Sequence, residues 1–236
     1  PSTSEYYNGS DLIAKIYFTF TTNSDNLVTE RKEELVYIKE DDSEGDRILI
    51  KKKTFDLNNL VDGEIVMMNI GLFYGSDTGN TEVIAGLIQN KIGVDKVDLF
   101  DVYDCDPADI TNYDHVIIGL STWHDGQLQS DWDTFFEEFK EVDFTGKTVA
   151  MFGLGDQYVY SDYYIDGVGI IGEIAMGNGA KMIGKWSTEG YEHTESKAET
   201  EEGFFLGMAI DEDNQSDQTD ERIEQWVEQI SQEFPL

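Results

Sequence analysis

The chain is poor in cysteine, in histidine and in long apolar runs. Its 236 residues include a single cysteine, Cys105, which excludes an internal disulfide framework and a cysteine-based zinc or iron–sulfur site. No apolar run is long enough to cross a bilayer as a helix, so we expect no membrane insertion. A chain of this length is expected to hold one large domain or two modest ones.

Basic residues are also scarce. Sixteen lysines and arginines stand against 49 aspartates and glutamates, which gives a formal net charge of −33. Residues 66–236 alone carry 8 basic and 35 acidic residues. So acidic a chain repels nucleic acid and anionic membranes and favours partners with a basic face. A chain whose surface is merely soluble or halophilic also has an excess of acidic residues, so acidity by itself does not distinguish it from a chain that binds basic partners.

The residue patterns of hydrolases and metal centres are missing. The sequence contains no His/Cys cluster, no paired catalytic carboxylates and no Ser-His-Asp spacing. His115 lies at the start of an expected strand and His193 in a polar stretch, and neither is expected to bind a metal. Cys105 lies between two aspartates and has no cationic neighbour in sequence to make it reactive.

Residues 70–81, IGLFYGSDTGNT, join an apolar run to a short polar segment. The run from Val66 to Tyr74 has the length of a buried strand, and apolar residues at helical spacing follow from Val83. A turn from strand to helix offers free N–H groups and a positive dipole end to a phosphate. The segment contains no Lys or Arg, so it is not a Walker loop, and G-x-G-x-x-G is absent. An ordinary capped turn would show the same pattern.

From residue 66 onward, expected strands and helices alternate. Strands are expected at 97–102, 115–121 and 149–154, and a last one in two pieces, 181–186 and 204–210, split by a polar insertion at about 187–203. This order indicates an α/β domain at 66–236 with a doubly wound, five-stranded parallel sheet. Ligands of such sheets bind beyond the carboxyl ends of the strands, where the polar loops fall.

Residues 1–65 follow a different pattern. We expect a disordered start over residues 1–9, with no targeting peptide visible. From Leu12 the residues alternate as in strands, and further short strands are expected at 35–38, 48–50 and 65–68. We therefore predict a small antiparallel β-rich accessory module of no recognised family. Its basic cluster, Lys51–Lys53, is either a solvated strand edge or a docking patch.

Three loops and the tail resemble the flavodoxins, small FMN-binding electron carriers. The S-x-T-G-x-T pattern that begins at Ser76 resembles the phosphate loop of this family. Residues 121–132, STWHDGQLQSDW, resemble the first flavin loop, and residues 155–162, GDQYVYSD, resemble the second. The stretch DEDNQSD at 211–217 is similar to the ending of long-chain flavodoxins of cyanobacteria and algae. The resemblance runs collinearly from about residue 66 to the end of the chain.

The resemblance implies a flavodoxin-like fold with FMN as cofactor and no metal. It places Trp123 and Tyr160 on the two faces of the flavin, with Tyr158 as the alternative to Tyr160. It also implies that the peptide between His124 and Asp125 turns over on one-electron reduction. The implied FMN-binding residues are Ser76, Asp77, Thr78, Gly79, Asn80, Thr81, Ser121, Thr122, Trp123, His124, Asp125, Gly126, Leu154, Gly155, Asp156, Tyr160 and Asp162.

The function that the resemblance implies is electron transport by an acidic, monomeric flavoprotein, which is not an enzyme. Such a low-potential one-electron carrier replaces ferredoxin between photosystem I and ferredoxin–NADP⁺ reductase in photosynthesis under iron limitation. It would work in the cytoplasm of a cyanobacterium or in the plastid stroma of an alga. Two alternatives remain: an FMN-dependent quinone-type reductase on the same fold, and a flavodoxin that residues 1–65 tether to one complex.

Overall fold

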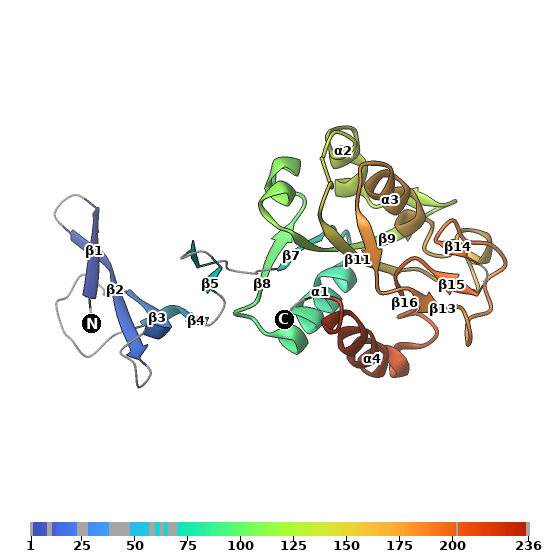
Figure 1. Cartoon of the computed structure of the whole chain (residues 1–236). Coiled ribbons are helices and arrows are strands. Elements are labelled where there is room, and N and C mark those ends of the chain that lie inside the picture. The colour runs from blue at the N-terminus through green and yellow to red at the C-terminus, as the bar shows by residue number, and fades with distance from the viewer. Residues whose placement is uncertain are drawn as a thin grey trace. The chain divides into compact units, whose positions relative to one another are not determined.

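The computed structural model describes residues 70–201 and 203–234, together with six strands between residues 2 and 65. By its backbone contacts the chain divides into two units, Pro1–Met67 and Met68–Leu236. Both units are drawn in Figure 1.

The first unit is antiparallel, as its alternating sequence predicts. Four strands form a sheet in sequence order: β1 (Ser2–Asn8), β2 (Asp11–Thr22), β3 (Val28–Tyr37) and β4 (Ile48–Asp56). Strands β5 (Leu60–Val61) and β6 (Glu64–Ile65) form a separate pair. Of the strand expected at 65–68, only residue 65 is among the described residues. The expected disordered start is wrong, because β1 pairs with β2 along its whole length. Lys51–Lys53 lies in the edge strand β4, with Lys53 opposite Glu33 in β3.

The second unit contains the predicted doubly wound parallel sheet. Its strands are β7 (Ile70–Tyr74), β8 (Val97–Asp101), β9 (His115–Trp123), β11 (Thr148–Leu154), β12 (Lys181–Ile183) and β16 (Met208–Ile210). They lie in the order β8-β7-β9-β11, and β12 and β16 share the position beyond β11. Strand β12 pairs with the start of β11 and β16 with its end, so the last strand is split as predicted. A short strand, β10 (Gln127–Leu128), pairs antiparallel with the end of β9.

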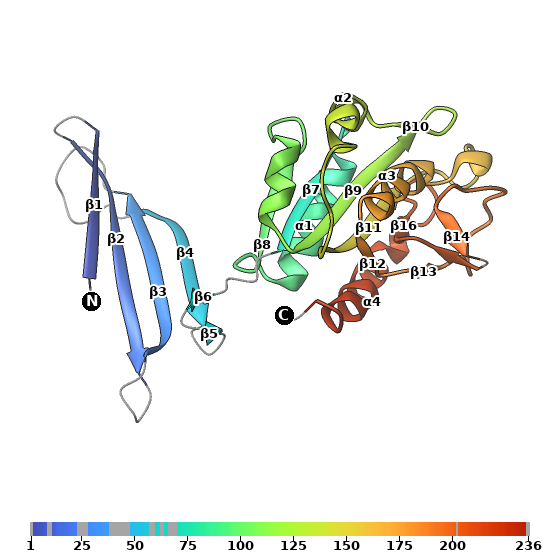
Figure 2. The ribbon, with the colours of Figure 1, turned by 45° about the horizontal axis from the view of Figure 1, so that its top comes forward.

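Helices cover both faces of this sheet, as Figures 1 and 2 show. Helices α1 (Asn80–Ile92) and α4 (Thr219–Ser231) pack on one face, and α2 (Ser130–Phe139) and α3 (Asp166–Gly177) on the other. The period of two in a strand explains why there are two cores. In β9, Val116 and Ile118 pack with α2 and α3, whereas Ile117 packs with α1 and α4. Among the described residues, no helix has the length and apolarity needed to cross a bilayer.

The insertion in the last strand forms a small sheet of its own. Strands β13 (Trp186–Ser187), β15 (Phe204–Phe205) and β14 (Glu199–Glu201) pair antiparallel in that order. The expected limits of the insertion, 187–203, are therefore too narrow. The reason is aromatic packing: the buried ring of Phe205 lies 5.7 Å from the ring of Tyr164 and 5.4 Å from that of Tyr191, between centroids. Short 3₁₀ helices lie at Pro107–Asn112, Ser161–Tyr163 and Ser216–Gln218.

Candidate functional site

A cavity of about 440 Å³ lies where β7, β9, β11 and β16 end, at the carboxyl edge of the parallel sheet. The residues that line it come from all three predicted loops and from the segment after β16. They are Thr78, Asn80, Thr81, Ser121, Thr122, Trp123, His124, Leu154, Gly155, Asp156, Tyr160, Glu212 and Asp213. Parallel strands bring their carboxyl ends to one edge, which is why loops so far apart in sequence meet here.

Most of the residues that the sequence suggested for this site line the cavity. Six of them do not: Ser76, Asp77, Gly79, Asp125, Gly126 and Asp162. Two lining residues, Glu212 and Asp213, were not among the sequence candidates. They lie two and three residues after the end of β16, so the rule that places ligands at strand ends could have found them.

The loop between β7 and α1 is organised partly by itself and partly by α2. Gly79 has a φ of 90°, which favours glycine, and its N–H donates to Ser76 Oγ at 3.0 Å. The carboxylate of Asp77 accepts hydrogen bonds from Ser130 Oγ and, at 3.0 Å, from Gln129 Nε2. Asp77 therefore joins the loop to the start of α2. Gly75 allows the loop to lie this close to Gln129, because a Cβ at residue 75 would be only 2.2 Å from Gln129 Oε1.

The end of β9 and the turn that follows it bring Trp123 and His124 to the cavity. Trp123 Nε1 donates to Ser121 Oγ at 2.9 Å, which fixes the half-buried indole. His124 has a φ of 46°, an unusual conformation for a side chain larger than glycine, and Gly126 follows with a φ of 84°. These two residues make the tight turn into β10. Asp125, at its tip, is exposed.

Thr122 connects the end of β9 to α3. Its Oγ1 accepts a hydrogen bond from the N–H of Gly167, in the first turn of α3, at 2.9 Å. Ile165, just before that helix, has a φ of 48° and is fully buried in the core. Its apolar side chain thus serves packing and does not line the cavity.

Asp156 shapes the loop after β11. Its Oδ1 accepts hydrogen bonds from the backbone N–H groups of Tyr158 and Val159, both at 2.9 Å. Partial burial raises the pKa of this carboxyl, but those two bonds and one from Asn214 outweigh burial and lower it overall. Asp156 is therefore ionised at neutral pH.

The cavity contains carboxylates but no fixed positive charge. Asp156, Glu212 and Asp213 line it, and none of its lining residues is Lys or Arg. Elsewhere, burial and then nearby carboxylates raise the pKa of the Cys105 thiol to about 12. That thiol is protonated at neutral pH and therefore a poor nucleophile, as its sequence neighbours suggested. Among the described residues, no three His, Cys, Asp or Glu side chains gather as a metal site needs.

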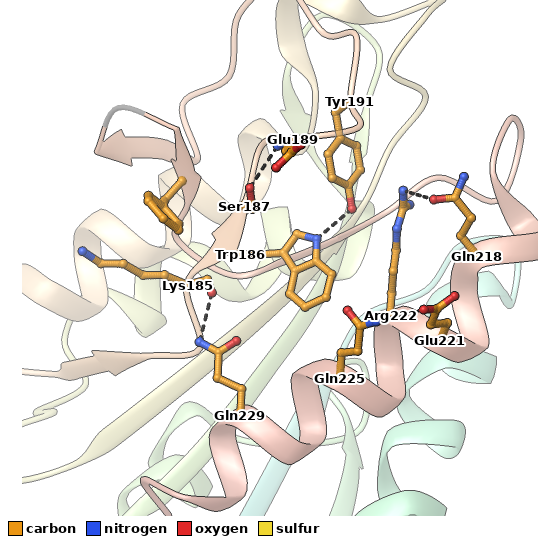
Figure 3. A pocket seen from close by; sticks show the side chains of 11 residues that line it. Lys185, Trp186, Ser187, Glu189, Tyr191, Gln218, Glu221, Arg222, Gln225 and Gln229 are labelled. Atoms are coloured by element: carbon orange, nitrogen blue, oxygen red, sulfur yellow. Dashed lines mark hydrogen bonds between the residues drawn. The ribbon is translucent and has the colours of Figure 1, made fainter.

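A second cavity, of about 540 Å³, lies between the inserted sheet and α4 (Figure 3). Its walls hold the insertion against that helix. Trp186 Nε1 donates to the hydroxyl of Tyr191 at 3.0 Å, and the guanidinium of Arg222 stacks 4.4 Å from the centroid of the Tyr191 ring. Arg222 also donates to Gln218 Oε1 at 2.8 Å. None of the predicted site residues lines this cavity.

Comparisons with known proteins agree on one family. A family model described as Flavodoxin matches residues 72–226. A flavodoxin of Nostoc sp. is 49% identical over 167 residues, which are 71% of this chain and 98% of that protein. A flavodoxin of Haemophilus influenzae is 48% identical over 170 residues, 72% of this chain and 98% of that protein. Among solved structures, Fusobacterium nucleatum flavodoxin bound to flavin mononucleotide has a TM-score of 0.67 at 32% identity, covering 70% of this chain and 98% of its own.

Proposed function

This chain belongs to the flavodoxin family, and we propose that it carries single electrons at low potential between proteins. Its cofactor is FMN, which we place in the cavity at the ends of β7, β9 and β11. It is therefore an electron-transfer protein and not an enzyme with a substrate of its own.

The phosphate end of FMN would lie at the start of α1. Thr78, Asn80 and Thr81 line the cavity there, and the first turn of a helix has N–H groups without an intrahelical acceptor. Hydroxyl, amide and backbone N–H donors together hold a phosphate without a basic side chain. This donor set suits FMN better than a nucleoside triphosphate, whose usual loop supplies a lysine.

The flavin ring would lie between Trp123 and Tyr160. Trp123 ends β9 and Tyr160 lies in the loop after β11, and both line the same cavity. Aromatic side chains cover an aromatic ligand by stacking and exclude water from its faces. When bound, FMN supplies the electron storage that no side chain in the cavity offers.

The carboxylates in the cavity support a low potential. Asp156, Glu212 and Asp213 line it, and the hydrogen bonds of Asp156 keep its charge in place. Negative charges near the ring oppose the addition of further negative charge, so they disfavour full reduction. The observation that carries the proposal is this one cavity, which combines neutral donors, two aromatic rings and carboxylates and lacks Lys and Arg.

Stepwise reduction tests the proposal. The full chain, saturated with FMN, would be titrated anaerobically with dithionite while its visible spectrum is recorded. We expect a long-wavelength band that appears with the first electron per flavin and disappears with the second. Bleaching in a single two-electron stage would instead favour the quinone-type reductase. Hydride uptake from NADPH without a helper protein would favour it too, and failure to take up FMN would refute both.

We also propose photosystem I as electron donor and ferredoxin–NADP⁺ reductase as acceptor, as the resemblance to cyanobacterial and algal members implies. The chain would then replace ferredoxin in photosynthesis under iron limitation, as a monomer in cyanobacterial cytoplasm or plastid stroma. Flash-induced reduction by photosystem I, followed by oxidation by the reductase and NADP⁺, tests this. Reduction by a bacterial flavodoxin reductase but not by photosystem I would contradict it.

We propose that residues 1–65 are a separate accessory module; the alternative role is a tether that holds the carrier at one photosynthetic or reductase complex. The comparisons with flavodoxins cover only about 70% of the chain, which supports a module separate from the carrier domain. Deleting residues 1–65 should leave FMN binding and the spectrum unchanged but abolish retention by the complex. Equal retention of both chains would show that the module is no tether.

A further inference from the structure

Asn214, which lies shortly after β16, donates its side-chain amide to two carboxylates at once. Its Nδ2 lies 2.9 Å from Asp156 Oδ1 and 3.0 Å from each carboxylate oxygen of Asp211. Asp156 belongs to the loop after β11, whereas Asp211 directly follows β16. The amide therefore connects the loops that leave two neighbouring strands.

Asp211 is the fixed end of this connection. It is fully buried, and its Oδ2 accepts hydrogen bonds from the amide of Gln157 at 2.7 Å and from the Gln157 backbone N–H at 3.2 Å. Gln157 is fully buried as well, and its Oε1 accepts from the N–H of Glu192, in the insertion, at 2.8 Å. Strand, loop and insertion thus hold the Asp211 carboxylate in one place.

Asp156, the second carboxylate that Asn214 contacts, lies at the cavity and holds the turn that carries Tyr160. The same Oδ1 that accepts from Asn214 accepts from the N–H groups of Tyr158 and Val159, and the N–H of Tyr160 donates to the Asp156 carbonyl at 3.1 Å. The position of this carboxylate therefore sets the turn that presents Tyr160 to the cavity.

An uncharged donor suits the position between these groups. Two carboxylates that share one neighbour repel each other, and a neutral amide with two N–H donors satisfies both without adding charge. A carboxylate in place of the amide would remove both donors and add a third negative charge. The chemistry of residue 214 therefore decides whether the loop of Asp156 stays against the last strand.

We propose that Asn214 is a positioning residue for bound FMN: its amide fixes Asp156, and with it the turn that carries Tyr160, against the buried Asp211. The inference rests on the FMN site proposed above. Asn214 is itself exposed, so its replacement leaves both cores intact.

Two variants of the full chain test this role, Asn214→Ala and Asn214→Asp. The FMN dissociation constant would be measured by flavin fluorescence between pH 5.5 and 8. We expect Asn214→Ala to weaken binding about ten-fold at every pH, the loss typical of charge-assisted hydrogen bonds. Asn214→Asp should weaken it more at pH 8 and approach the unaltered chain as pH falls, because protonation removes the added charge and restores a donor.

Asn90→Asp is the matched control. Asn90 is also exposed and donates through Nδ2, to the carbonyl of Gly86 at 2.8 Å, but it lies in α1 outside the cavity lining. Its variant adds the same charge and should bind FMN like the unaltered chain. A constant ratio of Asn214→Asp to unaltered affinity at all pH values would overturn the proposal, because loss of packing alone is independent of pH.

Amide exchange gives a readout that does not depend on FMN. In Asn214→Ala the N–H groups of Tyr158 and Val159 should exchange faster than in the unaltered chain, whereas the amides of β11 should not. Unchanged exchange at both positions would refute the role of Asn214 even if affinity fell. If the unaltered chain took up no FMN, the proposed function would fail; if it bound FMN and both variants bound equally well, only the role of Asn214 would fail.

Discussion

Tyr158 and Tyr160 lie two residues apart in one loop, and both side chains are exposed, by 54% and 43%. Only Tyr160 lines the cavity at the carboxyl edge of the sheet. The intervening residue, Val159, is 71% exposed and donates its N–H to Asp156. The two tyrosines therefore offer a matched pair for testing which ring covers the flavin.

We expect Tyr160→Ala to weaken FMN binding about ten-fold or more, because stacking on an aromatic side chain contributes about 1–3 kcal/mol. Tyr158→Ala should change the dissociation constant by less than about two-fold, since that side chain does not line the cavity. Flavin fluorescence on titration of the apoprotein measures both constants. The reverse order of effects would assign the stacking role to Tyr158.

His115, at the start of β9, links stability to pH. Burial lowers the pKa of its imidazole, and the charge of Asp114 opposes this only in part. Its Nδ1 is buried without a hydrogen-bond partner among the described residues, and its ring lies 5.3 Å from that of Phe234. The folded chain therefore binds a proton at this site less readily than the unfolded chain does.

A histidine with a lowered folded pKa favours the folded state fully only above its unfolded pKa, about 6.5. As pH falls from there toward the folded pKa, the unfolded state gains protons and stability is lost. We expect His115→Phe to remove part of this loss between pH 7 and pH 5. Urea midpoints at several pH values measure it. Parallel pH profiles for the two chains would exclude His115 as the source.

For single residues, the sequence predicted those that lie at strand ends and did not predict side-chain hydrogen bonds between segments far apart in the chain. Trp123 is the last residue of β9 and Asp156 lies two residues after β11, so their position at the cavity could be predicted from the strand ends. The contact of Asp77 with Gln129 could not, because its partner comes 52 residues later and its geometry depends on where α2 begins. Glu212 and Asp213 belong to the stretch at 211–217 that resembles the flavodoxin ending, but nothing in that pattern indicated that their side chains reach the cavity.

Among the elements, helix α4 is held on the sheet mainly by the packing of one tryptophan, Trp226. Trp226 is fully buried against Phe152 of the sheet, and its Nε1 donates to the carbonyl of Gly184 at 2.8 Å. Gly184 has a φ of 74°, and a Cβ there would lie 2.8 Å from Trp226 Nε1. The indole therefore holds both α4 and the point where the insertion leaves the sheet.

We expect Trp226→Ala to lower the free energy of unfolding by about 3–5 kcal/mol, the usual loss for a large buried aromatic side chain. Trp226→Phe should cost less, about 1–3 kcal/mol, mainly because the Gly184 carbonyl loses its donor. The half-buried Trp186, which donates to Tyr191, is the control: Trp186→Phe should cost less than Trp226→Phe. Urea unfolding followed by circular dichroism ranks the three.

Elements with a regular period were predictable, and those held by tertiary packing were not. The strands of the parallel sheet and the amphipathic α4 follow from their apolar spacing. The sheet of β13, β15 and β14 has strands of two or three residues, too short for a period. The packing of the Phe205 ring against the rings of Tyr191 and Tyr164 stabilises this sheet, and Tyr164 belongs to a segment distant in sequence.

For the whole molecule, charge dominates behaviour at a distance. The net charge of −33 creates a field that attracts basic proteins before contact and is screened by salt. We expect electron transfer from the reduced carrier to a basic haem protein to slow at least about ten-fold between 10 mM and 300 mM NaCl. Transfer to ferricyanide, a small anion, should speed up over the same range. Stopped-flow absorbance measures both, and a salt-independent rate with the haem protein would contradict electrostatic steering.

The split last strand has a consequence for protein engineering. Strand β12 pairs with β11 up to Ala150, and β16 pairs with β11 from Phe152 onward. The end of β12 and the start of β16 therefore lie in the same strand position of the sheet, separated by roughly 7 Å along β11. A foreign domain whose termini lie close together could therefore be grafted into the insertion without stretching the sheet. Because the N–H of Glu192 in that segment donates to Gln157, the neighbour of the cavity residue Asp156, the graft would be connected to the rim of the cavity by a hydrogen bond.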